Sequence, residues 1–225
     1  MDLNEALRTT GAVRDFVAEP VPDEVVYRVL DTARFAPSGG NRQAWRVIVI
    51  KDPDVRAKLR DLYQPGWHEY LAQSAAGLVP WAPAGDDDAQ RQAIEGAPAI
   101  AAGPGGFAEH LDEAPVLLAL LADLRGLAAV DKGFSRYTMA GAASIYPFAW
   151  SVLLAARAEG LGGVLTTIAI RREPQVLELL HVPDYFALAA VLVLGYPQRQ
   201  TRRLTRRPVE EFATVDFLDG RSFSP

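Results

Sequence analysis

The sequence offers few side chains for acid–base, nucleophilic or metal chemistry. It has no cysteine, and its three histidines, His68, His110 and His181, lie in unrelated contexts without a partner at ligand spacing. The triplet Asp86-Asp87-Asp88 stands in a stretch rich in proline and glycine, where acidic residues are usually solvated rather than bound to a cation. We therefore predict no metal site, and a reaction whose chemistry is carried by a bound cofactor rather than by a side chain.

Two groups of arginines suit an anionic ligand. Arg8 and Arg14 flank a turn of small residues, Thr9 to Ala12, where backbone N–H groups and a guanidinium can face a phosphate or a ring rich in carbonyl groups. A second group lies near the C-terminus and consists of Arg199, Arg202, Arg203, Arg206 and Arg207. Taken alone, each group is more typical of solvated surface charge, or, for the C-terminal group, of a nonspecific anion patch.

The segment from Pro37 to Trp45 is more informative, because a loop between a helix and a buried strand is a common place for a ligand. Two glycines, at positions 39 and 40, allow close approach of the backbone. Its hydroxyl and amide side chains, which suit a polyol, belong to Ser38, Asn41 and Gln43. An ordinary capped turn explains the same residues if the segment is considered in isolation.

Hydrophobic periodicity predicts the elements that would position these residues. We expect helices over residues 2–8, 23–36, 54–63, 140–159 and 174–180, and strands over residues 45–50, 115–121, 164–170 and 187–194. The helix over 140–159 is apolar on nearly every side, which predicts burial in the core or at a subunit interface. The pattern weakens between residues 65 and 106. These elements predict one α+β or α/β domain, residues 1–225, built on one central sheet.

Composition excludes several classes of function. The 225 residues are 49% hydrophobic and carry a net charge of −5, which provides no overall positive field for nucleic acid. The N-terminus is acidic where a secretory signal would be basic, and apolar runs reach only about eight residues, too few to cross a bilayer. We expect a cytoplasmic protein that binds neither nucleic acid nor membrane.

Four motifs in order resemble those of the FMN-dependent nitroreductase family. Residues 33–45 are similar to its A-x-x-A-P-S-x-x-N-x-Q-x-W signature, and Arg14-Asp15-Phe16 to its R-x-F. Glu159-Gly160-Leu161-Gly162 is similar to its E-G-L-G, and Leu194-Gly195-Tyr196-Pro197 precedes a basic tail as in the family. The resemblance runs nearly end to end, with a variable excursion at about 65–134.

The resemblance implies an α+β sandwich whose mostly antiparallel central sheet is flanked by helices, and an intertwined homodimer with FMN at the subunit interface. Arg14 would face the isoalloxazine near N1 and O2, where its charge favours the reduced ring. The partner chain would donate a loop containing Pro37, Ser38, Gly39, Asn41 and Gln43. Backbone N–H groups around Leu165, Thr166 and Thr167 would approach N5 and O4. Arg206, with Arg207, would hold the phosphate.

One departure from the family stands in the N-terminal turn. Where the family has arginine, a variable residue and serine, this chain has Thr10, Gly11 and Ala12, so one phosphate-binding guanidinium and one hydroxyl are missing. Compensation by Arg8 and the C-terminal arginines, weak FMN binding and a different ligand are the three alternatives. We favour compensation, because the C-terminal group is rich in arginine.

The family's chemistry implies that NADH or NADPH passes a hydride to flavin N5 and that an electron-poor small molecule, a quinone or nitroaromatic, then accepts it. Trp67, Tyr70 and Trp81 are candidates to line the acceptor pocket, although core packing is the more common explanation for such aromatic residues. Two alternatives stay open. One is specialised flavin chemistry on the same fold, such as dehalogenation, fragmentation of reduced flavin or oxidation of a peptide-bound heterocycle. The other is a non-catalytic flavin-storage protein.

Overall fold

Four antiparallel strands in the order β1-β2-β4-β3 form the central sheet. The computed structural model describes residues 1–96, 106–135 and 139–225. The strands are β1 (Trp45–Val49), β2 (Val116–Asp123), β3 (Gly162–Thr166) and β4 (Phe186–Gly195). Every residue of the inner strand β2 is buried, which explains why its sequence is apolar from Val116 to Ala122. The predicted α+β class with an antiparallel central sheet is confirmed.

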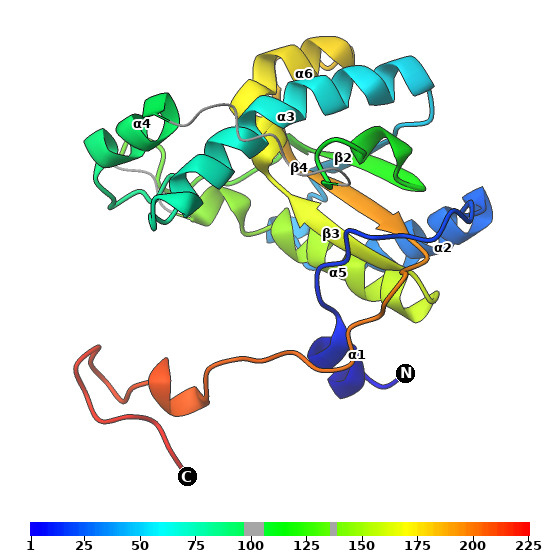
Figure 1. Cartoon of the computed structure of the whole chain (residues 1–225). Helices are drawn as coiled ribbons and strands as arrows, with labels where there is room; N and C mark the ends of the chain where they lie inside the picture. The colour runs from blue at the N-terminus through cyan, green and yellow to red at the C-terminus, as the bar shows by residue number, and fades with distance from the viewer. Residues whose placement is uncertain (97–105, 136–138) are drawn as a thin grey trace.

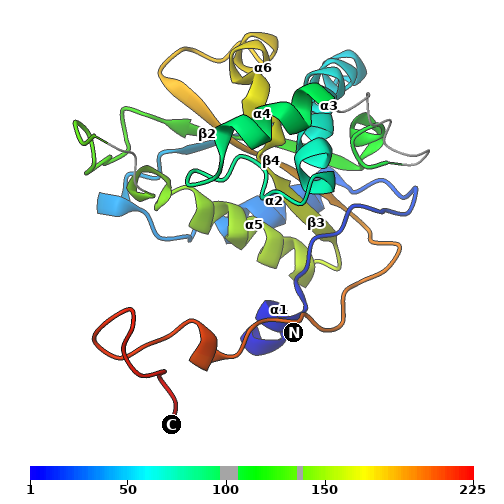
Figure 2. The ribbon, with the colours of Figure 1, turned by 60° about the vertical axis from the view of Figure 1, so that its left-hand side comes forward.

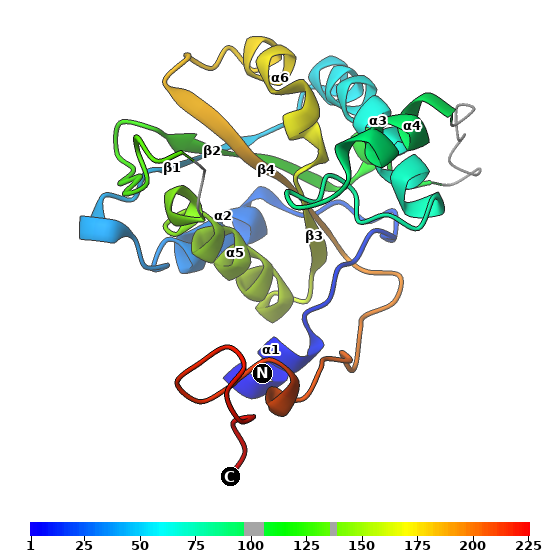
Figure 3. The ribbon, with the colours of Figure 1, turned by 90° about the vertical axis from the view of Figure 1, so that its left-hand side faces the viewer.

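Helices cover both faces of this sheet (Figure 1). The α-helices are α1 (Leu3–Thr9), α2 (Asp23–Ala33), α3 (Pro53–Ala75), α4 (Asp87–Gly96), α5 (Tyr146–Ala158) and α6 (Glu173–Leu179). Helices α2 and α5 share one apolar core with one face of the sheet. Helices α3 and α6 share a second core with the opposite face, as the turned views in Figures 2 and 3 also show. Both cores consist mainly of Leu, Val and Ala, as expected for an apolar sheet between helical layers.

Short 3₁₀ helices occupy several connections. They are η1 (Gly39–Asn41), η2 (Leu111–Glu113), η3 (Ala140–Ala142), η4 (Ile168–Arg172) and η5 (Val209–Glu211). None of the helices in the described ranges is long and apolar enough to cross a membrane. Residues 97–105 of the predicted variable excursion lie outside the described residues.

Helix α3 corrects the prediction of a short helix over 54–63. It begins at Pro53, where the side chain of Asp52 accepts hydrogen bonds from the N–H groups of two first-turn residues at 3.0 Å, and it continues through Pro65 to Ala75. Proline removes one backbone hydrogen bond, which is why the sequence predicts a stop. The helix persists because it packs closely on η4. A Cβ atom added at Gly66 would lie only 2.9 Å from Cγ2 of Ile168.

Two further elements differ from their predicted bounds. The strand predicted over 164–170 ends at Thr166, because Thr167 leaves the extended region with φ −106° and ψ 0° and begins η4. The helix predicted over 140–159 begins only at Tyr146. Helix α5 is also not buried all round in the single chain, since Tyr146 and Trp150 remain 37% and 39% exposed.

The C-terminal arm, residues 198–225, leaves the sheet after β4, runs past α1 and ends apart from the helical layers (Figures 1 and 3). Its first part is held against the N-terminal segment, because Gln198 N–H donates to the carbonyl of Asp15 at 3.0 Å. Its last part exposes several large apolar side chains, which are Phe212, Phe217, Leu218 and Phe223.

Candidate functional site

A cavity of about 410 Å³ lies where the N-terminal turn, α5, β3 and the C-terminal arm meet, and we call it the turn cavity. Its lining residues are Thr10, Gly11, Ala12, Arg14, Tyr146, Trp150, Leu153, Gly163, Val164, Leu165 and Arg206. Two of these residues are arginines, and none of the described residues that line the cavity is acidic. The turn cavity therefore combines positive charge with aromatic and aliphatic surface, which suits an anionic ligand with an aromatic ring.

Strand β3 holds the N-terminal turn in place along its free edge. The N–H of Val13 donates to the carbonyl of Gly163 at 2.9 Å, and Ala12 forms a parallel bridge with the same glycine. This approach requires a glycine at position 162, since a Cβ atom there would stand 2.8 Å from Cγ2 of Val13. The small residues of the E-G-L-G motif thus bring the turn, and with it Arg14, onto the sheet edge.

The C-terminal arm closes the turn from the other side. The N–H of Leu204 donates to the carbonyl of Arg8 at 3.2 Å. A Cβ atom at Gly11 would meet Thr201 Oγ1 and Leu204 Cδ2, each at 3.0 Å. Position 11 therefore has no room for a large side chain, and the arm that fills this space brings Arg206 into the turn cavity.

Three predicted residues far apart in the sequence converge on the turn cavity, namely Arg14, Leu165 and Arg206. Arg8 and Arg207 are exposed and do not line it, and Arg8 contributes its backbone carbonyl to the arm instead. Sequence reasoning missed Tyr146 and Trp150, although their spacing of four residues in the apolar helix places them on one face and was a usable signal.

The end of β3 presents its predicted residues to different surroundings. Leu165 lines the turn cavity, whereas the side chain of Thr166 is buried on the opposite face, where its Oγ1 lies 3.0 Å from the hydroxyl of Tyr63. Burial raises the pKa of Tyr63 to about 12. Thr167 is exposed. The Tyr63 and Thr166 pair ties α3 to the end of β3, and this long-range contact leaves no signal in the local sequence.

The loop after α2 is shaped by its own hydrogen bonds. The hydroxyl of Ser38 accepts from the N–H of Gln43 at 3.0 Å, and the amide of Gln43 donates to Asn41 Oδ1 at 3.1 Å. Asn41 and Gln43 have positive φ angles of 52° and 49°, a conformation that costs energy without support. Pro37, Gly39, Asn41 and Gln43 are exposed, and no residue of this loop lines the turn cavity of its own chain.

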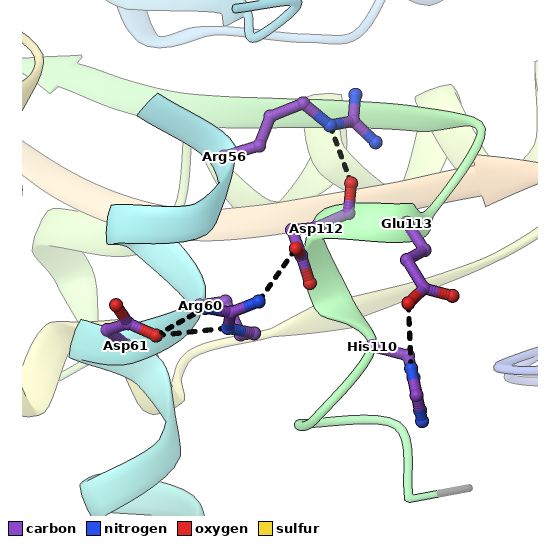
Figure 4. Close-up of polar contacts among 6 residues, drawn as sticks. All are labelled: Arg56, Arg60, Asp61, His110, Asp112 and Glu113. Atoms are coloured by element: carbon purple, nitrogen blue, oxygen red, sulfur yellow. Dashed lines mark hydrogen bonds and ion pairs between the residues drawn. The ribbon is translucent and has the colours of Figure 1, made fainter. Parts of the chain in front are cut away.

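A neighbouring hollow of about 660 Å³ shares Arg14 with the turn cavity. His110 lines it, and Glu113 raises the pKa of His110 through a hydrogen bond of 3.0 Å to Nδ1 (Figure 4). Arg56 donates to three backbone carbonyls, including that of Asp112 at 2.8 Å, and its burial lowers its pKa. Arg56 is therefore committed to holding the wall of this hollow.

The predicted acceptor-pocket aromatics pack against one another. Trp67 is stacked on Tyr70 with ring centroids 5.3 Å apart, and Tyr70 lies 6.3 Å from Trp81 with the two rings tilted by 42°. None of the three lines the turn cavity or the neighbouring hollow. The packing interpretation of these rings therefore accounts for their contacts.

An antiparallel sheet between two helical layers, with a cationic cavity at its edge, defines an α+β fold with one candidate site for an anionic ligand. The family model described as "Nitroreductase family" matches residues 7–196, which is most of the chain. The chain belongs to the nitroreductase family, as its four ordered motifs predict.

Individual relatives agree with this assignment. Iodotyrosine deiodinase 1 from Rattus norvegicus is 29% identical over 196 residues, which cover 87% of this chain and 62% of that protein. The chain thus matches less than two thirds of the length of this curated relative. A crystal structure of oxidized iodotyrosine deiodinase bound to FMN and 3-iodo-L-tyrosine has a TM-score of 0.64 at 21% identity, covering 92% and 96% of the two chains. The NADPH:FMN oxidoreductase from Vibrio harveyi, complexed with NAD⁺, has a TM-score of 0.66 at 20% identity and covers 95% and 77%.

Proposed function

We propose that this protein uses FMN to pass a hydride from NADH or NADPH to an electron-poor acceptor such as a quinone or a nitroaromatic. The observation that carries the proposal is the convergence of Arg14, Leu165 and Arg206 on one cavity. These residues come from three parts of the chain that are far apart in sequence, and such convergence is expected if they serve one ligand.

The residues of the turn cavity fit FMN. Arg14 and Arg206 provide positive charge, and no carboxylate competes for them among the described lining residues. The hydroxyl of Thr10 is buried and has no hydrogen-bond partner in the described parts of the chain, so it is available to a ligand. Tyr146 and Trp150 add aromatic surface. A ligand with an aromatic ring and a phosphorylated side chain would satisfy all of these groups at once.

Each side chain then has a defined task. Arg206, with Arg207 and Arg8 as nearby cations, would bind the phosphate, and each hydrogen bond to that charged group contributes about 1.5 to 3 kcal/mol. Arg14 would bind the polar edge of the ring, while backbone N–H groups of residues 165–167 approach its reactive side. Leu165 and the aromatic side chains of α5 exclude water. Bound FMN would supply the hydride acceptor and donor.

We also propose that two copies of this single domain complete the site. The Ser38–Gln43 loop carries the strongest family signature, yet it does not line the turn cavity of its own chain. Trp150 of α5 and the apolar side chains of the C-terminal arm are exposed in the single chain. A homodimer would cover this apolar surface and bring a partner's loop to the flavin.

Reductive dehalogenation of an aromatic compound is a second candidate. The identity of 29% to iodotyrosine deiodinase 1 favours it, because this relative's name states a deiodination. The two candidates share the cofactor and differ in the acceptor.

The absorption spectrum of the freshly purified protein tests whether it binds FMN, which both candidate functions require. We expect a flavin spectrum and tight binding of added FMN, whereas a colourless protein that does not bind FMN would refute both candidates. Steady-state oxidation of NADH and NADPH with a quinone then separates them. Fast turnover supports the first candidate, and negligible turnover beside dehalogenation of an iodinated tyrosine by the reduced protein supports the second.

A further inference from the structure

Two buried polar groups at the N-terminal turn lack partners in the described parts of the chain, and one of them, the hydroxyl of Thr10, belongs to a residue that lines the turn cavity. The side chain of Thr10 is only 7% exposed, and its hydroxyl makes no hydrogen bond to any residue that the structure describes. The same holds for Nε of Arg157, in the last turn of α5. Arg157 approaches the residue before Thr10, because Nη2 of Arg157 lies 3.5 Å from the hydroxyl of Thr9.

The residues around Arg157 cannot neutralise it. The nearest carboxylate in sequence, Glu159, is engaged by Arg28 at 2.6 Å. The hydroxyl of Thr9 donates to the carbonyl of Glu5 within α1 at 2.7 Å. Arg157 therefore forms no ion pair within residues 1–96, 106–135 and 139–225. A partly buried guanidinium without a carboxylate is costly, and an anionic ligand would relieve this cost.

The position of these groups matches the gap in the family motif. The family has an arginine in the turn where this chain has Thr10, and the next position, Gly11, is closed by Leu204 and Thr201 of the arm. The turn itself therefore cannot supply a guanidinium at either position. Arg157 approaches the same turn from α5, and Thr10 lines the turn cavity together with Arg206.

We propose that the hydroxyl of Thr10 and the guanidinium of Arg157, together with Arg206, bind the phosphate of FMN. This inference rests on the proposed function and deepens it, since it names the residues that replace the missing arginine. In this proposal the guanidinium comes from Arg157 of α5 instead of from the turn. The turn contributes the hydroxyl of Thr10, which donates a hydrogen bond to the phosphate. Two cations then face a phosphate dianion.

The test compares FMN with riboflavin, which has the same ring and no phosphate. The full-length chain, freed of flavin, is titrated with each compound, and binding is followed by quenching of flavin fluorescence. We expect Thr10→Val and Arg157→Gln each to raise the Kd for FMN about tenfold or more, since each loses a bond to a charged group. The Kd for riboflavin should stay within about twofold.

Matched controls remove the same groups outside the site. Thr32→Val deletes an exposed hydroxyl on α2, and Arg91→Gln deletes an exposed guanidinium that pairs with Asp88 at 2.7 Å. Both controls should change the Kd for FMN by no more than about twofold. Equal weakening of FMN and riboflavin by Thr10→Val and Arg157→Gln would overturn the inference, because it would place these residues at the ring or in the fold. Unchanged FMN binding in either variant would also overturn it.

Inorganic phosphate separates failure of this inference from failure of the proposed function. If the wild-type chain binds neither flavin, the proposed function fails. The anion site then still predicts that phosphate raises the Tm of the wild-type chain and not that of the Thr10→Val and Arg157→Gln variants. Absence of this stabilisation in the wild-type chain would refute the anion site as well.

Discussion

Replacement of Gly162 by alanine probes how β3 holds the N-terminal turn. The added Cβ would stand 2.8 Å from Cγ2, 2.9 Å from Cβ and 3.1 Å from Cγ1 of Val13. Val13 is buried and its backbone is bonded to Gly163, so it cannot simply turn its side chain away. The turn must shift outward, and Arg14 shifts with it.

The loss of unfolding free energy in Gly162→Ala follows from the overlap between the added Cβ atom and the side chain of Val13. Carbon atoms pack at about 3.5 to 4.0 Å, so contacts of 2.8 to 3.1 Å force a displacement of several tenths of an ångström. Overpacking of this kind costs about 1 to 3 kcal/mol, and the reduced freedom of the unfolded chain returns about 0.4 to 1 kcal/mol. The Gly162→Ala protein should therefore lose about 1 to 2 kcal/mol of unfolding free energy and bind FMN more weakly.

Val13→Ala provides the decisive comparison. Alone, this change removes two buried methyl groups and should cost about 1.6 kcal/mol. Combined with Gly162→Ala, it removes two of the three atoms that the new methyl group meets, Cγ1 and Cγ2, and leaves Cβ of residue 13 at 2.9 Å. The double variant should therefore be about 1 kcal/mol more stable than the roughly additive expectation, and FMN affinity should recover in part.

Urea denaturation of the two single variants and the double variant measures this coupling, and FMN titration checks the site. Gly141→Ala is the matched control, because no heavy atom lies within 4 Å of its added Cβ. Losses that add within about 0.5 kcal/mol would refute the reasoning, since independent sites behave in that way.

Three other predictions concern separate contacts. Tyr63→Phe removes the buried hydrogen bond to Thr166 and should lower the unfolding free energy, measured in urea, by about 1 kcal/mol. In the wild-type protein, an absorbance titration should show Tyr63 ionising near pH 12 rather than 10. The hydrogen bonds from Arg125 lower the pKa of Asp123 from 3.8 to about 2. Their stabilising effect on the fold is therefore present above pH 3.8 and is lost as pH falls toward 2. Arg125→Gln should return the pKa of Asp123 toward 3.8 in an NMR titration. Trp150→Glu places a charge on the exposed face of α5, where the proposed partner chain would pack. Sedimentation at micromolar concentration should therefore find dimers of the wild-type protein and monomers of the variant. A monomeric wild-type protein would contradict the proposed two-chain site.

Local sequence was sufficient for much of the fold. Continuous apolar runs predict β2 and β4 because an inner strand of this sheet is buried on both faces and needs no polar alternation. The start of α2 at Asp23 follows Pro22, as predicted. The predicted end of the helix at residue 63 was wrong because contacts between distant segments outweighed the local helix-breaking effect of Pro65. Helix α3 continues through Pro65 because it packs on η4.

The sequence by itself determined the family, because four ordered motifs and the overall pattern of strands and helices are properties of the chain read in one direction. Only the tertiary structure decided which arginines share a cavity. Arg206 reaches Arg14 because the arm packs over Gly11, and Arg157 reaches the same turn because α5 lies behind it. These contacts depend on which atoms fill the space between segments that are up to nearly two hundred residues apart in the sequence. Hydrophobic periodicity and motif spacing carry no information about how that space is filled.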